Sequence, residues 1–235
     1  MTALSATRLV NRLLNDLPRK EHDRIRERCE SVELAFGTIL CEPDEPFDHV
    51  YFPLSGFISL VELVGNHQPL EMGLIGSEGM LGATMALGVY KAPLRAVVQG
   101  AGTALRMPAT EFDRELRNTP VLLSTMGRYL YILMAQLAQT AACTCFHEVE
   151  ARLARWLLMT HDRAHANHFH LTHKFLADML GVQRSAVTIA AGTLQKRMLI
   201  HYTRGEINII NRKGLEAASC ECYVAVTEDY TRLFP

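Results

Sequence analysis

The sequence predicts an α+β fold in which a β-rich N-terminal part is joined by one long helix to a winged helix-turn-helix. Three observations predict it: short β-prone runs between residues 32 and 107, a heptad-like spacing of apolar residues after Pro120, and two short helical patterns around Gly181. The 235 residues are 49% hydrophobic and 21% charged, as in globular proteins. We expect three parts, at 1–119, 120–146 and 147–235.

The composition excludes several classes of protein. No run of apolar residues approaches the roughly 18 that a membrane span needs, so we expect no membrane association. The first thirty residues are rich in arginine and lack the uninterrupted apolar segment of a secretory signal. Six cysteines are too few for a disulfide scaffold. We therefore expect a cytoplasmic protein with free thiols.

The charge is unevenly distributed along the chain. Residues 1–149 contain 13 basic and 17 acidic side chains, whereas residues 150–213 contain 10 basic and 4 acidic ones, a net charge of +6. Six of the ten histidines also lie in residues 150–213 and become cationic most readily near a polyanion. This concentration of positive charge predicts a nucleic-acid surface.

The N-terminal part predicts two short helices followed by strands. Residues 5–30 have apolar side chains at helical spacing, and Pro18 divides them. After them come five β-prone runs separated by Gly, Pro, Asn and Asp, which indicate a compact sandwich or barrel. These runs are 32–36, 50–52, 57–64, 96–98 and 104–107.

A long helix is expected from Pro120, with apolar residues at alternating steps of three and four. This is the spacing of a coiled-coil seam, and we expect it to join two copies of the chain into a symmetric homodimer. The alternative is a helix packed on its own β-rich part, because spacing alone does not identify the partner. The expected seam residues are Leu123, Met126, Leu130, Leu133 and Leu137.

The next elements form the predicted helix-turn-helix. A helix at 147–162 is followed by a polar loop, and Thr172 is a suitable N-cap for a short helix that Gly181 ends. A second helix is expected at 183–198. Its inward face would consist of Val187, Ala190, Ala191, Leu194 and Met198. Strand-like runs on both sides of Arg204-Gly205 predict a hairpin wing.

The second helix carries the residues expected to bind double-stranded DNA. Residues at the start of such a helix reach base edges in the major groove, whereas basic side chains around it contact phosphates. The expected base-reading residues are Gln183, Arg184, Ser185 and Thr188, and the expected phosphate contacts are Thr172, Lys174, Lys196, Arg197 and Arg204. The alternative is a helical hairpin that only supports the core.

The order of these parts resembles the cyclic-AMP receptor protein/Fnr (Crp/Fnr) family of bacterial transcription regulators. The resemblance rests on Gly37-Thr-Ile-Leu, Val50-Tyr-Phe-Pro-Leu-Ser-Gly, Gly76-Ser-Glu-Gly-Met-Leu-Gly and Phe175-Leu-Ala-Asp-Met-Leu-Gly-Val. It implies a cyclic-nucleotide-binding-like β-roll (jelly roll), a dimerisation helix and a winged helix on a twofold-symmetric operator. It also implies a regulator that contacts RNA polymerase, not an enzyme.

The resemblance is weaker where a cyclic nucleotide would bind. The family's nucleotide binders have a Phe-Gly-Glu turn and an Arg-Ser pair, but this chain has Leu81-Gly82-Ala83 and Pro93-Leu-Arg95-Ala96. Losing the acid and the serine would leave polar groups of the ligand unpaired, so we expect no cyclic nucleotide and no cofactor. An unidentified effector would lie near Gly79, Leu81, Gly82 and Arg95. The alternatives are an effector-independent regulator and, less favoured, a cyclic-AMP-responsive one.

Cysteines and histidines give weaker signals. Cys143-Thr-Cys145 and Cys220-Glu-Cys222 are tight pairs, which would bind zinc or form a redox switch if the fold brought them together. Neither pair has the usual two-residue ligand spacing, so we expect free thiols and no metal site. A second metal pattern depends on one helix continuing beyond Asp162; its residues are His161, His165, His168 and His170.

Overall fold

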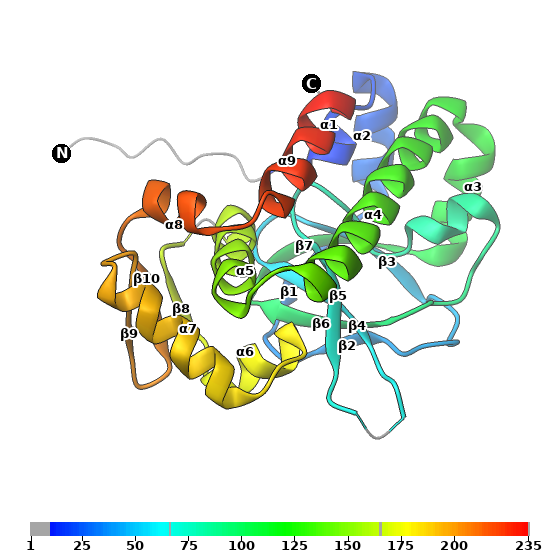
Figure 1. Cartoon of the computed structure of the whole chain (residues 1–235). Helices are drawn as coiled ribbons and strands as arrows, with labels where there is room; N and C mark the ends of the chain where they lie inside the picture. The colour runs from blue at the N-terminus through cyan, green and yellow to red at the C-terminus, as the bar shows by residue number, and fades with distance from the viewer. Residues whose placement is uncertain (1–9, 66, 165, 235) are drawn as a thin grey trace.

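The computed structural model describes residues 10–65, 67–164 and 166–234. An N-terminal β-roll packs against one long helix, and a C-terminal winged helix-turn-helix lies beside the β-roll (Figure 1). The chain enters through α1 (Arg12–Asn15) and α2 (Arg19–Glu27), the two short helices expected around Pro18. The predicted α+β fold class is confirmed.

The β-roll consists of two antiparallel sheets, with strand orders β1-β7-β3 and β2-β6-β4-β5. The strands are β1 (Glu30–Leu34), β2 (Ile39–Cys41), β3 (His49–Pro53), β4 (Phe57–Glu62), β5 (Leu70–Ile75), β6 (Arg95–Gly100) and β7 (Gly102–Pro108). The five predicted runs correspond to β1, β3, β4, β6 and β7. Two strands escaped prediction: β2 has only three residues, and β5 contains Glu71 and Gly73 in place of β-branched residues.

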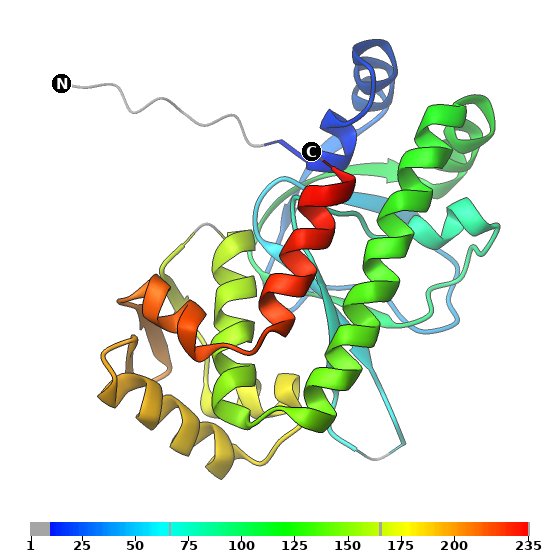
Figure 2. The same cartoon turned by 45° about the horizontal axis from the view of Figure 1, so that its top comes forward.

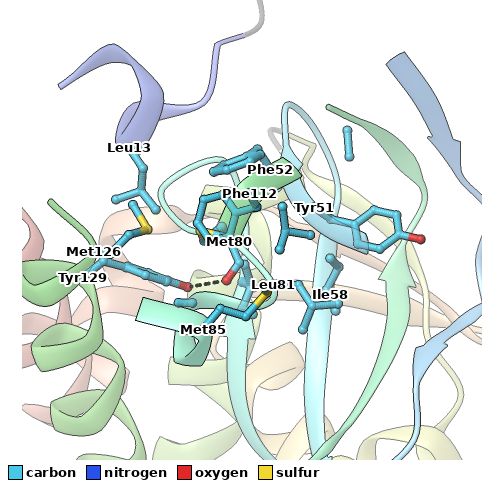
Figure 3. Packing of buried hydrophobic residues seen from close by; sticks show 14 of the residues in the cluster. Leu13, Tyr51, Phe52, Ile58, Met80, Leu81, Met85, Phe112, Met126 and Tyr129 are labelled. Carbon is cyan, nitrogen blue, oxygen red and sulfur yellow. Dashed lines mark hydrogen bonds between the residues drawn. The ribbon is translucent and has the colours of Figure 1, made fainter. Parts of the chain in front are cut away.

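The core of the β-roll extends onto the helices that follow it. Two helices follow β7, α3 (Ala109–Asn118) and α4 (Pro120–Phe146). Both contact η1 (Ala83–Leu87), a short 3-10 helix between β5 and β6. Phe112 of α3 meets Phe52 edge to face at 6.0 Å between ring centroids (Figure 3). From α4, the buried Tyr129 hydroxyl donates to the Met80 carbonyl oxygen at 3.2 Å. These contacts attach α4 to the β-roll of its own chain.

α4 is long and apolar enough to cross a membrane by length and composition alone. One of its faces is buried against the β-roll, as in the core helix of a folded domain. Another face packs beside the C-terminal helix α9 (Cys222–Leu233), which lies along α4 in Figure 2. The helix composition is therefore weak support for a membrane span.

The C-terminal part begins with α5 (Val149–Ala164) and contains the expected helix-turn-helix, α6 (His173–Leu180) and α7 (Arg184–Lys196). The wing strands are β9 (Ile200–Thr203) and β10 (Glu206–Ile209), and α8 (Arg212–Ala218) precedes α9. Part of the expected polar loop is instead a strand, β8 (His168–His170), which pairs with β10.

Two details of this part differ from the prediction. Met198 was expected to face the core, but it is 66% exposed, because α7 ends at Lys196 and the backbone turns through a positive φ of 57° at Met198. The C-terminal helix also returns to the N-terminal part. Val226 and Tyr230 of α9 belong to the same buried cluster as the β-roll, so the last helix packs with a core formed mainly by residues before 133.

Two glycines of the helix-turn-helix provide a matched test of this fold. Gly181 has a φ of +63° and caps α6, whereas Gly192 is inside α7 with nothing within 4 Å of a Cβ built there. We expect Gly181→Ala to lower the free energy of unfolding by about 1–2 kcal/mol through left-handed strain. Gly192→Ala should raise it by about 1 kcal/mol through helix propensity. Urea unfolding measures both, and changes of the same sign would contradict the assigned backbone geometry.

Candidate nucleic-acid interface and its junction with the β-roll

The helix-turn-helix is built from local interactions. The Thr172 hydroxyl accepts a hydrogen bond from the Phe175 backbone N–H at 3.1 Å, which caps α6 as the sequence predicts. The turn at Gly181 then leads to Gln183, which is the N-cap of α7 and not its first helical residue. The inner face of α7 consists of Val187, Ala190, Ala191 and Leu194, all buried. This arrangement leaves the opposite face of α7 in solvent.

The structure brings the predicted base-reading residues together at the start of α7. Gln183, Arg184, Ser185 and Thr188 are all exposed. Thr188 is partly occupied, since its hydroxyl donates to the Arg184 carbonyl at 3.0 Å and lies 2.9 Å from His173 Nδ1. Burial, followed by the nearby charge of Arg184, lowers the pKa of His173. The exposed face of α7 thus begins with an arginine and short polar side chains.

Sequence reasoning missed one residue of this face as a contact. Ile189 is 71% exposed on α7, directly after Thr188. A large apolar side chain in solvent on such a helix is suited to contact with a thymine methyl group. The sequence could have indicated this exposure, because Ile189 does not fall on the spacing of the residues predicted to face the core.

The predicted phosphate contacts fall into two groups. Within the described residues, Lys196 and Arg204 are exposed and have no acidic partner within ion-pair distance. Lys174 and Arg197 are paired, to Asp178 and to Glu150, each at 2.6 Å. The Thr172 hydroxyl is occupied by its cap. Exposed ion pairs contribute little energy, so Lys174 and Arg197 can exchange these carboxylates for phosphates at small cost.

The wing is a tight hairpin. Arg204 and Gly205 both have positive φ, 49° and 87°, which is the backbone of a type I′ turn. The wing is fixed to the helices by Gln195 Oε1, which accepts from the Tyr202 N–H at 2.6 Å, and by stacking of Tyr202 on His173 at 4.2 Å. The tip at Arg204 therefore has a defined place beside α7.

The junction between the two parts contains a buried carboxyl group. Glu71 of β5 accepts hydrogen bonds from the Ser59 hydroxyl at 2.6 Å and from Trp156 Nε1 of α5 at 2.7 Å. Burial raises the pKa of Glu71 from 4.5 to about 7, against the opposing effect of the two hydrogen bonds and of Arg163 and Arg155. A polar link between the β-roll and α5 thus has an acid that titrates near neutral pH.

Apolar contacts surround this link. Phe175 of α6 lies 6.1 Å from the Trp156 ring and 6.4 Å from the ring of Phe36, which belongs to the β-roll. On the same side, a Cβ at Gly181 would lie 2.7 Å from Leu70 Cδ1. The helix-turn-helix therefore packs directly on the β4–β5 sheet edge of its own chain.

The side chains of the chain itself fill the space predicted for an effector. Leu81 is buried in the core, and a Cβ at Gly79 would overlap the Tyr129 hydroxyl. The Cβ position of Gly82 is closed by Val50 Cγ1 at 2.6 Å, and Arg95 pairs with Glu42 at 2.8 Å. Packing therefore closes the space at Gly79, Leu81 and Gly82, and Arg95 is held in a partly exposed ion pair.

A cavity of about 800 Å³ lies elsewhere, where α5 and α9 meet the N-terminal part. Its wall contains the buried ion pair between Arg163 of α5 and Glu78, with 2.7 Å between the charged atoms. Its polar lining also includes Arg12, Asp162, Arg212 and Tyr230. This volume is within the range of small-molecule sites.

The predicted seam of α4 is wrong for two of its five residues. Met126 and Leu130 are buried in the core of their own chain, so a second chain cannot reach them. Leu133 and Leu137 are half-buried, and Leu123 is exposed. The exposed stripe with the same alternating steps is Ser124, Gly127, Tyr131, Met134, Ala138 and Ala141. The same alternating spacing occurs on two adjacent faces of α4, and the face with Met126 and Leu130 packs on the β-roll.

The fold brings together cysteines from the two predicted pairs, Cys143-Thr-Cys145 and Cys220-Glu-Cys222. Cys143 lies 3.5 Å from Cys220 between their Sγ atoms, and Cys222 Sγ lies 3.4 Å from His147 Nδ1. Cys145, the expected partner of Cys143, is exposed. The hydrogen bond with Cys220 lowers the pKa of Cys143 to about 5 and raises that of Cys220.

The histidine pattern at 161–170 includes His165, which lies outside the described residues. His168 and His170 both pair with Glu206.

Comparison with known proteins assigns both parts of the chain. Residues 31–119 match the cyclic nucleotide-binding domain and residues 151–218 match the Crp-like helix-turn-helix domain. The fold and the exposed α7 thus define a DNA-binding transcription regulator with a cyclic-nucleotide-binding type of β-roll. The chain belongs to the Crp/Fnr family of transcription regulators.

Solved structures of similar fold cover most of the chain. A transcriptional regulator of the CRP/FNR family from Thermus thermophilus is 22% identical, with a TM-score of 0.67 over 81% of this chain and 98% of the other. The c-di-GMP responsive global regulator CLP of Xanthomonas campestris is 16% identical, with a TM-score of 0.65 over 82% of this chain and 99% of its own. At these low identities, the structural similarity establishes the fold alone. No curated protein sequence matches the chain significantly.

The buried carboxyl of Glu71 predicts a pH-dependent stability. Its folded-state pKa of about 7 is raised above its ordinary value of 4.5, so the folded protein binds more protons between these values. The contribution to stability is fully present below pH 4.5 and is lost as the pH rises to 7, by about 3 kcal/mol. Glu71→Gln should remove this slope, as measured by urea unfolding from pH 5 to 8.

Glu33→Gln is the matched control, because Glu33 is exposed on β1 of the same β-roll. It should keep the pH dependence of the unsubstituted protein. A Glu71→Gln protein with that same dependence would show that Glu71 titrates in its ordinary range.

Proposed function

We propose that this protein binds a twofold-symmetric operator as a homodimer, with α7 of each subunit in a major groove. The observation that carries this proposal is the exposed first turn of α7, where Arg184 stands among Gln183 and Ser185, outside any ion pair of the described residues. An arginine in this position can donate two hydrogen bonds to the O6 and N7 atoms of guanine. The helix start is the part of a recognition helix that reaches base edges.

The remaining contacts position the protein on the duplex. Lys196 and the wing tip at Arg204 lie beside the exposed face of α7 and supply charge to phosphates. Ile189 adds an apolar contact with thymine. The resemblance of this chain to the Crp/Fnr family further implies contact with RNA polymerase, and this stays a prediction.

The dimer is proposed to form through the exposed stripe of α4, from Ser124 to Ala141. Tyr131 and Met134 are 50% and 62% exposed, which is unusual for large side chains at the centre of a long apolar helix. Gly127, Ala138 and Ala141 are small enough to let a second helix approach closely, and nothing lies within 4 Å of a Cβ built at Gly127. A parallel pair of α4 helices would place both copies of α7 on the same side of the dimer.

An effector is proposed to act at the cavity beside Arg163 and not at the predicted site in the β-roll. A ligand there would contact α5 and the β-roll together, so its binding energy would differ between two placements of the DNA-binding part. A change of placement re-spaces the two recognition helices, and a mismatch to the operator loses one half-site. The alternative is a regulator without an effector, controlled by its amount in the cell.

The base-reading role of α7 predicts a contrast between two substitutions. Arg184→Ala should reduce discrimination at one base pair of each half-site by about 1–3 kcal/mol and leave binding to random DNA almost unchanged. Lys196→Ala should weaken binding to all sequences alike and lower the salt slope by about 1 per subunit. Selection from a random DNA pool, followed by titration against the enriched site at several salt concentrations, measures both effects.

The order of that experiment makes it informative at each step. Enrichment of a twofold-symmetric sequence by the unsubstituted protein supports the homodimer on an operator. An Arg184→Ala protein that loses specific and random DNA binding equally would refute the base-reading role.

The stripe on α4 predicts that a charge at Tyr131 separates the subunits. Tyr131→Glu would bury two unpaired carboxylates in the dimer, one from each subunit, at a cost of at least about 3 kcal/mol, or a factor of at least about 100 in the dissociation constant. Its fold should persist, since Tyr131 is half exposed in the single chain. Ile210→Glu is the control, because Ile210 is 52% exposed and lies beyond the wing. Sedimentation equilibrium gives the dissociation constants; a Tyr131→Glu protein as dimeric as the control would contradict the proposed face.

A further inference from the structure

Four side chains that can bind metal meet where α4 ends and α9 begins. Cys143 lies in the last turn of α4, His147 is its C-cap, Cys220 follows α8, and Cys222 is the first residue of α9. One ligand atom from each side chain lies within 4.8 Å of all the others. The three cysteines are buried, whereas Cys145 and the partly exposed Cys29 lie outside the group.

We propose that Cys143, His147, Cys220 and Cys222 form a tetrahedral zinc site of the Cys3His type. The ligand set is one of the combinations found in structural zinc sites, with three soft thiolates and one imidazole. From the sequence, zinc binding was conditional on the fold bringing the two cysteine pairs together, and free thiols were expected because neither pair has the usual ligand spacing. The site combines residues that are 77 positions apart.

The distances fit a single ion. Two sulfur atoms that each lie about 2.3 Å from zinc at the tetrahedral angle are about 3.8 Å apart. Cys143 Sγ and Cys220 Sγ are 3.5 Å apart, and Cys222 Sγ is 3.4 Å from His147 Nδ1. A [4Fe–4S] cluster would need wider spacing, because each of its irons takes its own ligand. Small adjustments of side-chain torsions are enough to complete the zinc geometry.

The surroundings of the four residues are those of a metal site. His147 presents Nδ1 to the sulfur atoms, and its Nε2 lies 3.1 Å from the Glu221 carboxylate, which would fix the ring as in carboxylate–histidine–zinc arrangements. Gln139 Nε2 donates to Cys222 Sγ at 2.9 Å. Arg152 and Arg155 line the small cavity next to Cys143 and balance the net negative charge of three thiolates around one Zn²⁺.

The position of the site suggests its role. The DNA-binding part is connected to the rest of the molecule by two short segments, 147–148 after α4 and 219–221 before α9. His147 lies in the first segment and Cys220 in the second, so one ion would join both connections at one point. Binding releases the thiol protons to solvent and involves no oxidation or reduction.

The test is the metal content of the full-length protein purified under reducing conditions. We expect about one zinc per chain by mass spectrometry of the metal, and a release of zinc on titration with a thiol-reactive mercurial. Cys222→Ser and His147→Asn should each reduce the zinc content at least about tenfold after dialysis against a weak chelator. Cys145→Ser is the matched control and should retain the full amount.

Loading with Co²⁺ gives a second readout that does not depend on the variants. The metal-free protein, prepared with a chelator, should develop the intense visible bands of tetrahedral cobalt with one equivalent of Co²⁺, together with thiolate charge-transfer bands. Glu221→Gln should weaken Co²⁺ binding about 10- to 100-fold with the same spectrum, because it removes the partner of His147. Circular dichroism establishes that each variant is folded.

Two outcomes would overturn the proposal. One is a folded, unsubstituted protein that binds neither zinc nor Co²⁺ at these residues, including the case in which mass spectrometry finds a Cys143–Cys220 disulfide in the freshly purified chain. The other is a zinc content that Cys222→Ser and His147→Asn leave unchanged. Neither result would alter the DNA selection experiment, so failure of the metal site and failure of the proposed regulator are distinguishable.

Discussion

The structure depends on how α4 divides its surface among several partners. Its 27 residues contain apolar or small side chains on every side, so no polar face orients it. The buried hydrogen bond from Tyr129 to the Met80 carbonyl settles the orientation, because an unpaired hydroxyl in that core would cost free energy. Once Tyr129 faces the β-roll, Gln139 faces α9 and Tyr131 faces solvent. The positions of the C-terminal helix and of the free stripe both follow from this one attachment.

The DNA-binding part is held against the β-roll by buried polar links and by apolar packing, since Phe57 and Leu74 of the β-roll belong to the same buried cluster as α5 and α6. Glu71 accepts from Trp156, and Arg163 pairs with Glu78, each across the junction. Such groups are costly to leave unpaired, yet they contribute less net stability than apolar contacts of the same area. The polar links resist partial opening of the junction, and the shared apolar cluster adds to their effect.

The features that could be predicted from the sequence are those set by neighbouring residues. Thr172 as a cap, Gly181 as a stop and Arg204-Gly205 as a turn depend on local hydrogen bonds and on backbone freedom, and all three are found where expected. The strand β5 was not predicted, because Glu71 interrupts its apolar run. The partner that makes a buried carboxyl possible there is Trp156, which is far away in the sequence. The seam of α4 and the place of His147 likewise depend on contacts with α9 and the β-roll. Spacing alone carries no information about such partners.

The two connections to the DNA-binding part define how it can move. Both lie at the group of Cys143, His147, Cys220 and Cys222, so rotation of α5 about this point would leave these residues almost in place. Displacement grows with distance along α5: Trp156 is about 14 Å from His147 along a helix, and Arg163 is about 24 Å from it.

A given rotation therefore moves Arg163 further than Trp156. The pair of Arg163 and Glu78 lies at the wall of the 800 Å³ cavity, at the end of the longest lever arm in α5. If the proposed effector binds in that cavity, a small displacement there corresponds to the smallest rotation of α5, and α5 packs against α7, which carries Arg184. Of the sites along α5, this cavity is therefore the one at which a given displacement by the proposed effector would rotate the recognition helix through the smallest angle.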